Sequence, residues 1–206
     1  EYLASEGFVP KTLAEIGPKS GSVPGAHIRG KMEAILVIAA LIAFFLAWEY
    51  RRASRRLCSG EKQLEEAWRE ALDAFLERIA VLREFSRVLA KEGLVPEGRK
   101  ALEELVADAT ERELDVEAIH VLDEKIRTVL WRVFAALPRE RPGELRRAQN
   151  RLAEAAEEYD IKRRRYNELV KAWNELLGRF PYRFIAARRK YKAYEPLPIR
   201  SEWELS

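Results

Sequence analysis

Residues 61–91 read EKQLEEAWREALDAFLERIAVLREFSRVLAK. Their apolar residues recur at steps of three and four: Leu64, Trp68, Leu72, Phe75, Ile79, Leu82 and Leu89. That spacing puts them on one face of an α-helix. Recurrence of apolar residues at every seventh position is typical of helices that pack lengthwise against a partner. We therefore expect a long amphipathic helix here, ended by Gly93 and Pro96.

Helical periodicity continues to residue 177. A short segment carries Leu102, Leu105 and Val106 on one face, and Asp115 is a suitable N-cap for a helix that ends near Pro138. The last long helix should run from about 144 to 177, with Gly178 as its C-cap. Its expected stripe is Leu145, Leu152, Tyr159, Tyr166, Val170, Trp173 and Leu177. No stretch alternates as a strand would, so the predicted fold is all-α, an antiparallel bundle of three or four helices with long helices.

Upstream of this pattern lies an uncharged run, AILVIAALIAFFLAW, at residues 34–48. In a helix it spans about 22 Å, and flanking residues bring it close to the ~30 Å of a bilayer core. A buried helix would show some polar face, and the exit sequence is a poor cleavage site for a secretory signal. We predict an uncleaved single-pass anchor over residues 32–50, in contact with membrane lipids. Its defining side chains are Ala34, Leu36, Phe44, Phe45, Trp48 and Tyr50.

Basic residues flank this anchor unevenly. Four arginines follow it within residues 51–56, whereas only Arg29 and Lys31 precede it closely. The positive-inside rule then predicts that the C-terminal body faces the cytoplasm. The expected location is the inner, or cytoplasmic, membrane. Since the first helical pattern lacks any proline between 33 and 92, the long helix is expected to continue from the anchor without a break.

These features divide the chain into five expected regions. Residues 1–31 are a flexible extracytoplasmic tail or a mis-annotated extension, because the single methionine, Met32, begins the apolar run. The anchor occupies 32–50, a basic juncture 51–60 and the helical body 61–197. Residues 198–206 form a tail.

Composition offers little for catalysis. The 206 residues include one Cys and two His, which excludes an intrachain disulfide framework and a cysteine-based zinc site. Glu117 and His120 have the E-x-x-H spacing of di-iron bundles, but such a site needs a second His in the bundle, and none exists. An ordinary helix histidine is the favoured interpretation. We expect no enzyme and no cofactor; a metal-binding bundle is the least favoured alternative.

Two blocks of sequence resemble the LemA family. Residues 165–174 read RYNELVKAWN, similar to the family's R-Y-N repeat, and are followed by Phe180-Pro181 and later by Tyr194-Glu195-Pro196. Residues 65–68 read EEAW, similar to a signature on the family's first long helix. The residues that carry the resemblance, and a candidate partner face, are Trp68, Tyr166, Asn167, Val170, Trp173, Asn174, Phe180 and Pro181.

The resemblance covers about residues 32–197 and marks a divergent member. The proline-containing stretch that usually follows E-E-A-W is absent from residues 78–85, and residues 94–140 match nothing in the family. The resemblance implies a membrane-anchored, cytoplasmic helical domain and no enzyme. We expect a scaffold or interaction protein with a protein partner or a second copy of itself.

Asn167 and Asn174 stand one heptad apart and therefore share a helix face. A polar pair that fixes helix register through interhelical hydrogen bonds is the favoured interpretation, and a groove for a partner is the alternative.

Charge is unevenly distributed, although the formal net charge is only +3. Residues 61–160 hold seventeen basic and twenty-four acidic residues, whereas 161–192 hold eleven basic and two acidic ones. Arg163, Arg164, Arg188 and Arg189 represent this basic surface. It would pair with the acidic helices, contact anionic lipid or bind nucleic-acid phosphates; pairing is favoured and nucleic acid is the least favoured partner.

Overall fold

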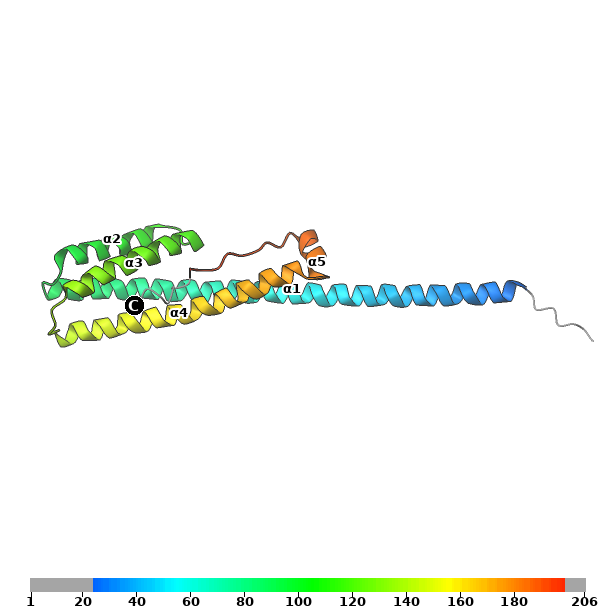
Figure 1. Cartoon of the computed structure of the whole chain (residues 1–206), viewed down its shortest axis with the longest axis horizontal. Coiled ribbons are helices and arrows are strands. Elements are labelled where there is room, and N and C mark those ends of the chain that lie inside the picture. The colour runs from blue at the N-terminus through cyan, green and yellow to red at the C-terminus, as the bar shows by residue number, and fades with distance from the viewer. Residues whose placement is uncertain (1–23, 199–206) are drawn as a thin grey trace, which may run out of the picture. The chain divides into compact units, whose positions relative to one another are not determined.

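A computed structural model describes residues 24–198 of the chain, with side chains from Met32 onward. This part is helical, and no strand occurs among residues 24–198. Five helices follow one another: α1 (Pro24–Lys91), α2 (Pro96–Glu111), α3 (Val116–Ala136), α4 (Gly143–Gly178) and α5 (Tyr182–Arg189) (Figure 1). The expected all-α fold class is therefore confirmed. The tails expected over 1–23 and 199–206 lie outside the described residues.

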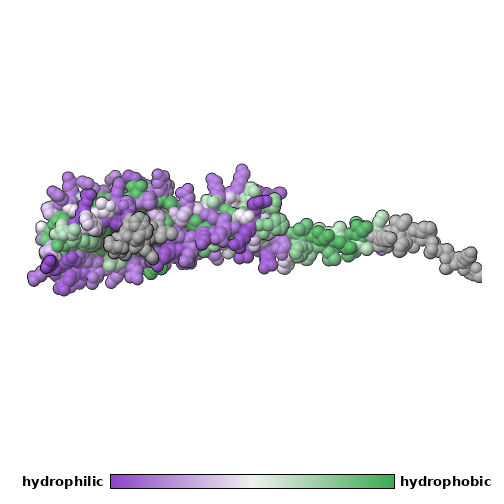
Figure 2. All heavy atoms as spheres, in the orientation of Figure 1, coloured by the Kyte–Doolittle hydropathy of each residue, from purple (hydrophilic) through white to green (hydrophobic). Residues whose placement is uncertain are grey.

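Helix α1 is continuous over 68 residues, as the absence of proline predicted, and it belongs to two compact units. The first unit ends at Trp48 and the second begins at Glu49. Within the first unit, the stretch after Met32 is apolar and none of its residues is buried (Figure 2). By length and composition this is the one helix in the described part of the chain that could cross a membrane.

A tight turn separates α1 from α2. Gly93 has a φ of 66°, in the left-handed region that glycine adopts without steric cost. Pro96 is the first residue of α2, where its missing N–H would have no helical partner in any case. Gly93 and Pro96 thus end one helix and start the next, close to the positions predicted.

Helices α2 and α3 lie side by side in Figure 1. A Cβ at Gly98 of α2 would lie 2.6 Å from a methyl of Val133, so only glycine allows this close approach. The predicted cap of α3 is confirmed, because the Asp115 carboxylate accepts a hydrogen bond of 2.7 Å from the Ala118 N–H.

Helix α4 runs antiparallel to the C-terminal half of α1 (Figure 1). Lys91 pairs with Glu144 at 2.6 Å, Arg151 with Glu84 at 2.7 Å, and Arg165 with Glu70 at 2.7 Å. Residue numbers therefore rise along α4 as they fall along α1. The last contact of this series lies at Gly60, where a Cβ would meet the Trp173 ring at 3.2 Å.

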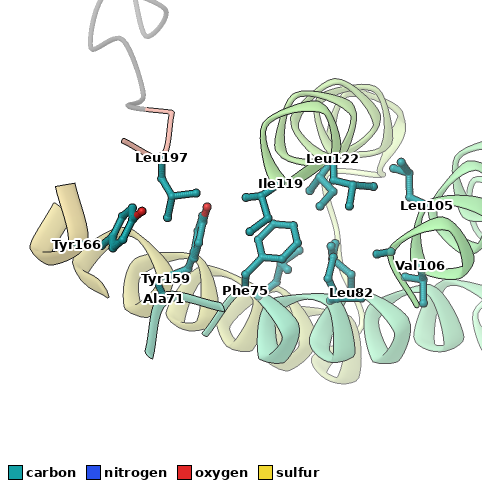
Figure 3. Close-up of a cluster of buried hydrophobic side chains, with 14 of the residues drawn as sticks. Ala71, Phe75, Leu82, Leu105, Val106, Ile119, Leu122, Tyr159, Tyr166 and Leu197 are labelled. Carbon is teal, nitrogen blue, oxygen red and sulfur yellow. The ribbon is translucent and has the colours of Figure 1, made fainter. Parts of the chain in front are cut away.

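The apolar faces of α1, α2, α3 and α4 share one buried cluster (Figure 3). Phe75 of α1 and Tyr159 of α4 are both fully buried, with ring centroids 5.2 Å apart. Fully burying such a side chain contributes about 1.5–3 kcal/mol relative to leaving it exposed. Helices α1 and α4 supply most of this cluster, and eleven of the fourteen residues predicted for their stripes belong to it.

The C-cap of α4 and the helix that follows it differ from the predictions. Helix α4 extends through Gly178, and the capping position falls on Arg179 with an ordinary φ of −87°, so Gly178 is not the C-cap. Helix α5 was not predicted, because its eight residues are too few to show a convincing period. The extended residues 191–198, which we call the strap, follow α5 and bring Leu197 back into the core.

Candidate functional site

The two blocks of the predicted motif meet in space. The rings of Trp68 of α1 and Tyr166 of α4 pack at a tilted angle with centroids 5.4 Å apart, although the residues are nearly one hundred positions apart in sequence. Tyr166, Val170 and Trp173 are buried, as the stripe predicted. The antiparallel pairing of α1 and α4 explains the contact, because it places residue 68 opposite residue 166.

Asn167 and Asn174 form hydrogen bonds with the backbone of the strap. Asn167 donates from Nδ2 to the Leu197 carbonyl at 2.8 Å, and its Oδ1 accepts from the Leu197 N–H at 2.7 Å. Asn174 makes the same two hydrogen bonds with Tyr194: its Nδ2 donates to the Tyr194 carbonyl at 2.9 Å, and its Oδ1 accepts from the Tyr194 N–H at 3.1 Å. An Asn side chain has both a donor and an acceptor, so it can pair with an extended backbone as a neighbouring strand would.

Two aromatic side chains also form hydrogen bonds with the strap. Tyr166 donates its hydroxyl to the Glu195 carbonyl at 3.1 Å, and the Trp173 Nε1–H donates to the Lys192 carbonyl at 2.9 Å. Leu197 is only 1% exposed and belongs to the same buried cluster as Tyr159 and Tyr166, with which Figure 3 draws it. Four side chains of one helix face therefore bind six backbone groups of the strap.

This arrangement differs from both expectations for Asn167 and Asn174. Their partners belong neither to a neighbouring helix nor to a second molecule, because the chain's own strap occupies the groove. Sequence reasoning missed Leu197 as the residue that seats the strap. The motif did include Tyr194-Glu195-Pro196, but no sequence periodicity connects an extended segment with a helix thirty residues upstream.

Burial changes the acidity of the tyrosines at this site. Removal from water, with a smaller contribution from Tyr194 and Glu195, raises the pKa of Tyr166 to about 12. Burial, together with Glu61 and Glu65 of α1, also raises the pKa of Tyr194. The raised pKa keeps Tyr166 a neutral hydrogen-bond donor to the strap at alkaline pH values at which an ordinary tyrosine ionises.

Arg163 was predicted on the basic surface, and this prediction is wrong. Arg163 is 4% exposed, and its guanidinium lies 5.7 Å from the centroid of the buried Tyr159 ring. Arg78 of α1 lies at the same distance from that ring. Asp160 pairs with Arg163 at 3.1 Å, so the buried charge is compensated. Spacing alone did not reveal this, because basic residues adjoin position 163 on both sides.

Arg78 has a carboxylate partner that the sequence did not indicate. Its Nη1 donates a hydrogen bond to the Oδ1 of Asp123 on α3, and both residues are at least half-buried. Burial strongly raises the pKa of the Tyr159 phenol between the two arginines, and Asp123 raises it further. This cluster joins α1, α3 and α4 through one aromatic ring.

The rest of the basic segment behaves in two ways. Lys162 and Arg165 both pair with Glu70 of α1, at 3.3 and 2.7 Å, which is the favoured pairing with an acidic helix of the same chain. Arg164 is exposed and lines a shallow cavity of about 390 Å³ beside Phe134 and Gln149. The other part of the segment lies at the far end of α4, in and around α5.

The α5 region combines cations with exposed aromatic rings. Phe180 and Phe184 are 80% and 59% exposed, and their centroids lie 6.0 Å apart. Phe180 thus lies outside the core, unlike the other aromatic motif residues, and Pro181 is half-buried. Arg188 and Arg189 are exposed, as predicted.

Helix α5 lies close to Tyr50, the second residue of its unit. Hydrogen bonds with the Tyr191 and Tyr50 hydroxyls raise the pKa of Arg189. Because α4 runs antiparallel to α1, its C-terminal end returns to the beginning of the second unit.

The predicted anchor residues are uncovered. Ala34, Leu36, Phe44 and Phe45 are exposed in the described part of the chain, as are Trp48 and Tyr50, at 55% and 42%. Large apolar side chains over a surface of this length need a cover, and the described residues do not supply one.

Glu117 and His120 do not belong to a larger group of metal ligands in the described part of the chain. Glu117 and His120 are both exposed on α3, and no group of three His, Cys, Asp or Glu residues among the described side chains could hold a metal ion. Cys58, half-buried on α1, is a free thiol.

No protein-family model matches this chain, and no curated protein matches it either. The resemblance to the LemA family stays a prediction that rests on the motif residues quoted above.

Proposed function

We propose that this protein is a single-pass, membrane-anchored scaffold that holds a helical bundle at the cytoplasmic face of the inner membrane. The observation that carries the proposal is the uncovered apolar stretch of α1, which continues without a break into a helix with a buried face. On this proposal the continuous helix tethers the packed region to the membrane.

The contact between Trp68 and Tyr166 supports a LemA-like architecture. The two sequence blocks that suggested the family occupy one site, where Trp68 packs against Tyr166 and Tyr166 hydrogen-bonds to the strap. These motif residues therefore have a structural role in packing the chain, and we assign them no catalytic role.

Topology is tested with the chain's own thiol. Cys58 lies ten residues past Trp48, so a membrane-impermeant maleimide should label it only after bacterial cells expressing the full chain are permeabilised. A matched variant, Cys58→Ser with Asn150→Cys, moves the thiol to an exposed position on α4 and should behave identically. Labelling of both variants in intact cells would contradict the cytoplasmic placement.

The scaffold role predicts a partner or a second copy. Mass measurement of the detergent-solubilised full chain, together with cross-linking in native membranes, should detect one of them. A monomer that cross-links to nothing would contradict this role and leave the anchor untouched.

A further inference from the structure

The α5 region carries charge that the rest of the chain does not neutralise. Residues 176–194 contain no Asp or Glu, and five of them within 179–190 are Lys or Arg. Among the described residues, one ion pair involves these five cations, Arg179 with Glu175 at 3.3 Å. Arg163 and Arg165, by contrast, are paired with carboxylates of the same chain.

The same region exposes two phenylalanines. Arg183 lies over the Phe184 ring, with its guanidinium carbon 5.2 Å from the ring centroid, and Phe180 meets Phe184 edge to face. Among aromatic side chains of described residues 49–198, only Trp131 on α3 is comparably exposed. Exposed apolar rings rimmed by cations mark a surface that meets something both apolar and anionic.

The position of α5 indicates what that is. Near the end of α4, Trp173 lies against Gly60 of α1, where a Cβ would meet its ring at 3.2 Å, and it packs edge to face on Tyr191, which follows α5. Gly60 lies twelve residues past Trp48, the last residue of the apolar stretch. Residues 51–56 add four exposed arginines near the same end of the unit. We define residues 51–56 and 179–190 together as the basic-aromatic collar.

We propose that the basic-aromatic collar binds the headgroups of anionic phospholipids around the membrane anchor, with Phe180 and Phe184 entering the acyl boundary. This inference rests on the proposed anchor. Each Lys or Arg close to an anionic leaflet contributes about 1 kcal/mol, and the attraction extends about one Debye length, ~8–10 Å. Covalent continuity with the anchor keeps the collar at a high effective concentration near lipid, an advantage that nucleic acid lacks.

The test uses the full chain in lipid nanodiscs, with an environment-sensitive nitrobenzoxadiazole probe on a single cysteine. In a Cys58→Ser background, Ala187→Cys puts the probe on an exposed position of α5, and Asn150→Cys puts it on the distant end of α4. In nanodiscs with phosphatidylglycerol, the probe at 187 should brighten and shift to the blue. It should not do so with phosphatidylcholine alone, and the probe at 150 should respond in neither.

Two double variants separate charge from insertion. Arg188→Gln with Lys190→Gln should raise the phosphatidylglycerol content needed for half the response, since about 2 kcal/mol corresponds to about a 30-fold weaker attraction. Arg146→Gln with Arg147→Gln, at the distant end of α4, is the matched control and should change nothing. Phe180→Ser with Phe184→Ser should keep the dependence on anionic lipid but lose the blue shift.

The outcomes separate the collar from the anchor. A chain that fails to enter nanodiscs of either lipid overturns the anchor and the collar together. A chain that enters them but shows the same signal at 187 in both lipids overturns the collar alone. A response at 187 to an added oligonucleotide in neutral nanodiscs, with none to phosphatidylglycerol, overturns the lipid assignment in favour of nucleic acid.

Discussion

The two parts of α1 are built from similar apolar residues, but these are covered in different ways. After Glu49 the apolar positions form a stripe that belongs to the cluster shared with α2, α3 and α4, and Leu57, Phe75 and Leu89 are fully buried. From Met32 to Trp48 apolar residues surround the helix, and none of them is buried. A stripe can be covered by other helices of the chain, whereas a helix that is apolar all round needs apolar surroundings on every side, either protein or lipid.

The largest expected effect comes from putting charge in the apolar part. Ile38→Arg with Leu41→Arg should abolish carbonate-resistant membrane association, because each arginine near the centre of a span costs about 2.5–3.5 kcal/mol. Fractionation of cells expressing the full chain measures this. Ile161→Arg, at an isoleucine exposed on α4, is the control and should leave the membrane fraction unchanged. Retention of the double variant in the membrane would contradict the anchor.

The next largest effect is a loss of folding stability, expected when the apolar stripe of α1 is changed. Phe75→Ala should lower the free energy of unfolding by about 3–5 kcal/mol, because it removes a fully buried ring and leaves a cavity beside Tyr159. Chemical denaturation in detergent, followed by circular dichroism, measures the loss, and Leu76→Ala at the exposed neighbour is the control. Membrane fractionation should not change. A Phe75→Ala chain as stable as the control would place the core elsewhere.

A smaller and more local effect is expected at the strap. Asn167→Ala with Asn174→Ala removes four hydrogen bonds to Tyr194 and Leu197, at about 1 kcal/mol each. Hydrogen exchange of the Tyr194 and Leu197 amides should accelerate at least about tenfold while α1 amides keep their protection. Asn150→Ala, an exposed asparagine of the same helix, is the matched control. Unchanged exchange at the strap would show that Leu197 holds it without the asparagines.

The smallest effect is a pH dependence at high pH. The pKa of Tyr166 is raised to about 12, against an ordinary value of 10.0 in the unfolded chain. Between pH 10 and 12 the unfolded chain therefore loses this proton while the folded one keeps it, so stability falls as pH rises through that window and is unaffected below it. In Tyr166→Phe, denaturation midpoints should fall less steeply over the same window. Parallel curves for the two proteins would contradict the shift.

Local physics explains why so much of the helical architecture could be predicted from the sequence. The stripe of residues 61–91, the Asp115 cap and the last long helix depend on spacing and on neighbours within one turn, which a single chain displays directly. The apolar run of residues 34–48 is equally local, since its length and lack of charge are visible without any partner. Helix α5 escaped because eight residues do not reveal a period.

Tertiary structure decided which residues meet. Three arginines in a row look alike in sequence, yet Arg163 lies against the buried Tyr159 ring while Arg164 is exposed and Arg165 pairs with Glu70. Asn167 and Asn174 could be placed on one face, but their partner is an extended segment that no periodicity links to α4. The sequence determined the helices and the uncovered apolar stretch, because these depend on neighbouring residues. The strap, the buried arginines and the position of α5 beside Tyr50 depend on contacts between distant segments, and only the packed chain brings those together.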